Sequence, residues 1–166
     1  MLNKIGVAVL GFFMSLGAYA NGVPIVGTVD SKCVVTTDTF GVYGNPSPSI
    51  LSTDAADGGV LPIIRYDVIQ ADYYKALITY PISFSESPAL SDVVNWSGDV
   101  SVHEVSDAGM SAYDNSKVEY NNSTEIELSI AGSTWFKVES EADYGYNKAF
   151  PAGTYRAVVE AQCIAI

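Results

Sequence analysis

Few residues in this chain have the types and spacing that catalysis needs. The single histidine, His103, lies in Ser101–Val105, a run that alternates like a strand, so its imidazole faces the side opposite Val102. No Gly-x-Ser-x-Gly elbow, His-Glu-x-x-His helix or phosphate-binding glycine loop occurs. Acidic pairs such as Glu139 and Glu141 are expected by chance in a chain with 19 acidic residues. We therefore expect no catalytic residue and a protein that is not an enzyme.

The sequence contains no strong metal-binding or cofactor-binding motif. Asp54 and Asp57 offer hard oxygens beside Gly58 and Gly59, but their spacing differs from that of a calcium-binding loop. An ordinary Asx turn also explains this cluster, so calcium binding by Asp54 and Asp57 stays an open alternative. With one histidine and no Cys-x-x-Cys pair, the cysteines do not form a zinc site. We expect no metal and no cofactor.

The first twenty residues have the order of a signal peptide. Lys4 precedes the apolar run Ile5–Leu16, and the small-residue triplet Ala18-Tyr19-Ala20 predicts cleavage before Asn21. The run is shorter than the roughly 20 apolar residues that a transmembrane helix needs. We therefore expect a signal peptide over 1–20 and one domain over 21–166, exported to an oxidising compartment and not inserted in the membrane.

The two cysteines have their clearest role in such a compartment. Cys33 and Cys163 predict one disulfide, with a free or intermolecular thiol as the alternative. The bond would link the start of the mature chain to its last strand. In the chain-entropy model, closing so long a loop stabilises the fold by on the order of 4 to 5 kcal/mol.

The charge of the chain excludes one class of partner. Eight basic and 19 acidic residues give a net charge of −11. Such a surface repels phosphates and anionic lipid head groups, so we expect neither nucleic-acid binding nor electrostatic attachment to a membrane.

The residues that follow the signal peptide have the pattern of an all-β protein. The last strand alternates Tyr155, Ala157, Val159, Ala161 and Cys163 with more polar neighbours, which is a period of two. The other runs rich in β-branched and aromatic residues are 23–29, 33–40, 60–69, 73–80, 99–105, 125–130 and 134–139. Such runs, separated by turn clusters, predict an immunoglobulin-like β-sandwich of about seven to eight strands. Ser87–Val94 is expected as a short helix following Pro88.

Two side-chain placements follow from the strand pattern. Trp135 and Phe136 are adjacent in one strand, so one should be in the core and the other exposed or at an interface. Gly41–Gly59 is the best candidate for a ligand-binding loop, with Tyr43 and Asn45 as its presented residues.

Both ends of the mature chain resemble those of a known family. Gly153 is fourteenth from the C-terminus and begins the alternating run of the last strand. Val26–Val35 follows a Gly-x-Val and Cys-x-Val order. These stretches are similar to the ends of chaperone–usher pilus (fimbrial) subunits, including the archaic ones that resemble spore-coat protein U. They cover about a fifth of the mature chain.

The resemblance implies a sandwich that lacks its final strand. A periplasmic chaperone would fill the open groove first, and the N-terminal strand of a neighbouring subunit would then replace it at an usher, by β-strand addition. The protein would pass through the periplasm to the cell surface or the extracellular space as a pilus subunit with a role in adhesion. The resemblance gives the assembly strand as Gly153, Tyr155, Ala157, Val159 and Ala161, and the donor strand as Val23, Ile25, Gly27 and Val29.

A second interpretation remains open at this point. A disulfide between the first and last strands would close the sandwich and make a self-contained secreted or periplasmic binding module. Such a module would recognise a host or surface ligand through its loops.

Overall fold

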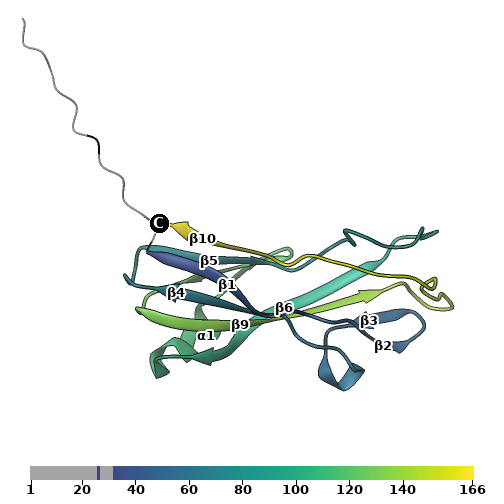
Figure 1. Ribbon diagram of the computed structural model, residues 1–166, viewed down its shortest axis with the longest axis horizontal. Helices are drawn as coiled ribbons and strands as arrows, with labels where there is room; N and C mark the ends of the chain where they lie inside the picture. The colour runs from purple at the N-terminus through teal and green to yellow at the C-terminus, as the bar shows by residue number, and fades with distance from the viewer. Residues whose placement is uncertain (1–25, 27–31) are drawn as a thin grey trace, which may run out of the picture. The chain divides into compact units, whose positions relative to one another are not determined.

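Alternating runs of β-branched and aromatic residues form two antiparallel sheets in the computed structural model of this chain (Figure 1). The structure describes Val26 and residues 32–166, and residues 32–166 belong to one compact unit. The predicted signal peptide lies outside the described residues. So does the predicted donor strand, with the exception of Val26.

The first sheet has six strands. Its order is β1-β4-β9-β3-β2, and β6 also pairs with β9. The strands are β1 (Cys33–Thr39), β2 (Gly44–Ser47), β3 (Ile50–Ser52), β4 (Ile63–Val68), β6 (Asn95–Val105) and β9 (Gly132–Asp143).

The second sheet has four strands in the order β10-β5-β8-β7. They are β5 (Tyr74–Thr79), β7 (Val118–Tyr120), β8 (Ser123–Glu127) and β10 (Glu160–Ala165). Two 3₁₀ turns, η1 (Ala55–Asp57) and η2 (Ala108–Ala112), and one short helix, α1 (Tyr113–Ser116), complete the described elements. In this part of the chain no helix has the length and apolar character to cross a bilayer.

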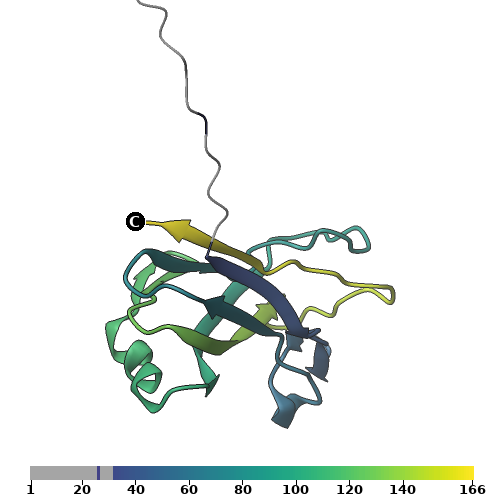
Figure 2. The same ribbon diagram turned by 60° about the vertical axis from the view of Figure 1, so that its left-hand side comes forward.

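The core lies between the two sheets (Figure 2). Its centre is an edge-to-face pair of the fully buried rings of Tyr66 and Phe136, with centroids 5.6 Å apart. Trp135, the neighbour of Phe136, faces the other side of β9 and stays partly exposed, which confirms the predicted split of this aromatic pair. The remaining fully buried large side chains are Ile78, Val100, Met110, Ile126, Leu128 and Val138.

The structure corrects several predicted elements. The region Ser87–Val94 contains no helix, because Pro88 packs near Gly153 and the Ser91 N–H donates to the hydroxyl of Tyr144. Ten strands stand in the described residues where about seven to eight were expected. Two of the additional strands, β2 and β3, fall in the segment predicted as a loop. β2 tolerates Pro46 because it is an edge strand of its sheet.

Candidate functional site: an apolar groove between β1 and β10

The sandwich has two strand edges along one side that do not pair with each other. Among the described residues, β1 pairs only with β4 and β10 pairs only with β5. β1 ends the first sheet and β10 ends the second, and they run along the same side of the molecule (Figures 1 and 2). A cavity of about 780 Å³ lies between β1 and the segment that leads into β10. We call it the groove.

Residues of two extended segments form the walls of the groove. β1 contributes Val35, Thr36, Thr37 and Thr39, and the C-terminal segment contributes Arg156, Ala157, Val158, Val159 and Ala161. On the C-terminal segment the alternate residues Val158, Glu160 and Gln162 are exposed. Exposure along the C-terminal run therefore alternates with the predicted period of two residues. The walls combine apolar side chains with an exposed backbone edge, which is the surface that β-strand addition uses.

The floor of the groove is apolar, and its polar groups have partners. Pro62 and Ile64 contribute apolar surface. The Tyr43 hydroxyl lies 2.9 Å from Oγ of Ser140. The hydroxyl of Thr53 accepts a hydrogen bond from the Ser140 N–H at 2.9 Å. Burial raises the pKa of Tyr43, so its phenol stays neutral at physiological pH. Among the described residues that line the groove, Arg156 on the C-terminal wall is the one with a charged side chain.

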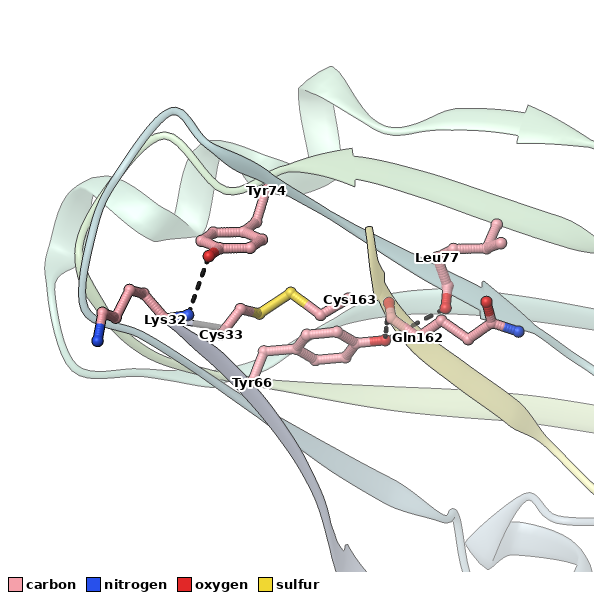
Figure 3. Close-up of a disulfide and its surroundings, with 7 residues drawn as sticks. All are labelled: Lys32, Cys33, Tyr66, Tyr74, Leu77, Gln162 and Cys163. Carbon is pink, nitrogen blue, oxygen red and sulfur yellow. Dashed lines mark hydrogen bonds between the residues drawn. A yellow bond between two sulfur atoms is a disulfide. The ribbon is translucent and has the colours of Figure 1, made fainter. Parts of the chain in front are cut away.

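A disulfide closes one end of the groove. Cys33, the first residue of β1, is bonded to Cys163 in β10, with the two Cα atoms 6.2 Å apart (Figure 3). The predicted disulfide is confirmed in this structure. Beside it, the Tyr66 hydroxyl donates to the carbonyl oxygens of Leu77 and Gln162. The bond ties the two sheets together at this end and leaves the rest of β1 and β10 apart.

Aromatic side chains gather at the open end of the groove. The ring of Phe84 makes edge-to-face contacts with Tyr43, Trp96, Phe150 and Tyr155, with centroids 4.7 to 6.5 Å apart. They bring together the loop after β5 and the segment that precedes β10, which also share backbone hydrogen bonds between Glu86 and Arg156. This cluster fixes the direction in which the C-terminal segment enters the groove.

The residues predicted for the assembly strand take two different places. Ala157, Val159 and Ala161 line the groove. Tyr155 belongs to the aromatic cluster, and Gly153 precedes the groove in a loop, where a Cβ atom would lie 2.5 Å from Cγ of Pro88. The predicted strand is regular only from Glu160 onward, because β5, which pairs with it, ends at Thr79, before Pro81.

The predicted loop residues have structural partners. Tyr43 lies in the groove, and the side-chain amide of Asn45 donates to the carbonyl oxygens of Ser47 and Ile50, which holds the turn between β2 and β3. Asp54 accepts from the N–H of Ala56 and caps η1, as the Asx-turn interpretation predicts. Within residues 32–166, no three His, Cys, Asp or Glu side chains are grouped to hold a metal ion. His103 is exposed on β6.

Half of the groove was not predicted from the sequence. Val35, Thr37 and Thr39 were not expected in a wall, and Pro62 and Ile64 were not expected in the floor. The alternation within 33–40 carries the signal for the first three. Nothing local to Pro62 or Ile64 indicates that the segment before β10, far along the chain, forms the other side of a cavity beside them.

Comparisons with models of protein families, with curated proteins and with solved structures found no match to this chain.

Proposed function

We propose that this protein is an assembly subunit of the pilin type, whose groove accepts an extended strand donated by a second copy of the chain. The observation that carries the proposal is the apolar groove between two strand edges of different sheets, β1 and β10. A strand inserted there would pair with the exposed backbone on both sides and cover the apolar floor. In this proposal the fold is an immunoglobulin-like sandwich that lacks its last strand.

The donor is the N-terminal segment of the neighbouring copy. The groove is bordered by residues 35–41 on one side and 156–161 on the other, which corresponds to a strand of roughly six or seven residues. Residues 23–29 match this length, and Val23, Ile25, Gly27 and Val29 share one face of a strand. Cleavage before Asn21 would leave this segment free ahead of Cys33.

The remaining parts of the proposal come from the resemblance at the two ends of the chain. A chaperone in the periplasm would hold the groove until an usher exchanges it for the donor strand, and the assembled fimbriae would stand on the cell surface. The groove geometry supports this order of events because an exposed apolar edge needs protection before assembly.

A peptide that copies residues 21–31 tests the proposal on the purified mature protein with its disulfide intact. We expect the peptide to raise the melting temperature by many degrees, since binding to the native state stabilises it. Native mass spectrometry should show heat-resistant ladders of the protein without peptide.

A matched pair of variants locates the binding site. Ala157→Phe places a ring in the groove and should abolish the rise in melting temperature, whereas Gln162→Phe, at an exposed position of β10 that does not line the groove, should leave it unchanged. If the peptide raised the melting temperature of both variants equally, its binding site would lie outside this groove.

The alternative function is a self-contained module that binds a ligand. The observation in its favour is the covalent link between the first and last strands. A stable monomer that ignores the peptide would support it, and the search for a ligand would then begin with the loop over residues 41–59.

A further inference from the structure

Exposed apolar side chains gather at the closed end of the sandwich. Ile69 and Tyr73 in the turn between β4 and β5, together with Ile166 after β10, are 56% to 75% exposed. Hydrogen bonds hold these residues together near the start of β1, because the Ile69 N–H donates to the Lys32 carbonyl and the Ile166 N–H to the Tyr73 carbonyl. We call this set the tail patch.

A second set lies beyond the other end of β1. Phe40, Val42 and Val60 are 42% to 81% exposed. Val42 and Val60 exchange backbone hydrogen bonds of 2.8 and 2.9 Å, so their side chains share one face, and Phe40 lies two residues before Val42 in the extended chain. Phe40 also lines the open end of the groove. We call this set the rim patch.

The length of the donor segment brings two copies into contact. In the proposed assembly the donor strand ends at Val29, and β1 of the donor begins at Cys33. Four residue steps span at most about 14 Å. In the proposed assembly, Cys33 of the donor therefore lies within about 14 Å of the place where the inserted strand leaves the acceptor, which brings the tail patch near that place.

That place is the open end of the groove. β10 runs toward the closed end, because Cys163 lies near its end and is bonded to Cys33. In the proposed assembly the donor strand is antiparallel to β10, so it runs toward the open end and leaves there. At the open end the donor meets the rim patch.

We propose that the tail patch of the donor copy packs on the rim patch of the acceptor copy, as a second contact between successive subunits. The inference rests on the proposed strand addition and adds a head-to-tail contact between folded bodies. The two patches belong to different faces of the same chain, so the contact is heterologous and propagates into a filament. It also explains why both ends of the sandwich carry exposed apolar side chains.

Charge substitutions test the contact without touching the groove walls. Val42→Lys on the rim patch and Ile69→Asp on the tail patch should each lower the fraction of chains of three or more subunits by about tenfold, since each buries one unpaired charge. The double variant V42K/I69D should recover much of this loss, because the two charges would then face each other between subunits. Val118→Lys and Tyr120→Asp, on the exposed strand β7, are the matched controls.

Binding of the peptide 21–31 separates this inference from the proposed function. All these variants should bind the peptide as the unsubstituted protein does, because the peptide carries no folded body. V42K and I69D could bind the peptide normally and still form assemblies of three or more subunits as abundantly as the unsubstituted protein does. That result would overturn the second contact and leave the proposed strand addition unaffected. A protein that does not respond to the peptide overturns both.

Discussion

The phenol oxygen of Tyr66, on the first sheet, lies 3.2 Å from the carbonyl oxygen of Gln162, on the second. The carbonyl oxygen of Leu77 on the neighbouring strand is at the same distance, so one O–H proton serves two strands (Figure 3). Because β10 has a described strand partner on one side only, this hydroxyl is one of the contacts that fix the edge of the groove. It does so beside the disulfide.

Replacing Tyr66 by Phe removes this contact and keeps the ring. We expect the free energy of unfolding to fall by about 1 to 3 kcal/mol, because the carbonyl groups of Leu77 and Gln162 lose this donor in a partly buried site. Urea unfolding of the oxidised protein measures the change, and Tyr120→Phe, at an exposed position, is the control. An unchanged midpoint for Tyr66→Phe would show that the hydroxyl contributes nothing to the fold.

The same hydroxyl predicts a loss of stability in alkali. Burial raises the pKa of Tyr66 far above its ordinary value, whereas in the unfolded chain the phenol ionises near pH 10. The unfolded state therefore releases its proton first, so the contribution of Tyr66 is complete below about pH 10 and is lost as the pH rises further. Urea midpoints measured from about pH 9 to pH 11.5 should fall less steeply in Tyr66→Phe. The urea midpoint of Tyr66→Phe should still fall with pH, because burial also raises the pKa of Tyr43.

Removal of the disulfide should weaken the fold and the groove together. Cys33 and Cys163 are 130 residues apart, and the chain-entropy model gives about 4 to 5 kcal/mol for a loop of this size. The variant C33S/C163S should unfold at a correspondingly lower urea concentration. Reduction of the unsubstituted protein by dithiothreitol should reproduce the shift and have no effect on the variant. A variant as stable as the oxidised protein would contradict this prediction.

Gly153 and Pro88 should behave as a coupled pair. A Cβ atom at position 153 would lie 2.5 Å from Cγ of Pro88, well inside contact distance. Gly153→Ala should destabilise the protein by roughly 1 to 3 kcal/mol, and Pro88→Ala in the same chain should restore part of the loss. Thermal unfolding of both single variants and the double variant completes the cycle. Additive effects would mean that the two residues do not press on each other.

Periodicity predicted the facing of strands better than their pairing. The alternation from Tyr155 to Cys163 indicates which side chains point inward, and Ala157, Val159 and Ala161 do line the groove. It does not indicate where pairing begins, because that depends on β5, which ends before Pro81. Regular strand therefore starts only at Glu160.

Local predictions based on proline were wrong where tertiary contacts determined the structure. Pro46 and Pro48 lie in the segment predicted as a loop, yet the end of the sheet accommodates Pro46 in β2. Pro88 suggested the start of a helix, but the loop it begins is held by Tyr144 and Gly153 from a distant part of the chain. Neither contact can be read from the local sequence.

The long span of the disulfide sets an order of events in folding. Cys33 begins the first described strand and Cys163 lies in the last, so the Cys33 thiol has to wait while the 130 residues up to its partner are made. In an unfolded chain of that length the two thiols meet rarely, whereas in the assembled sheets their Cα atoms are 6.2 Å apart. We therefore expect the sheets to assemble before the thiols are oxidised. In that order of events, the disulfide forms in a protein that is already folded and does not direct the folding of its sheets.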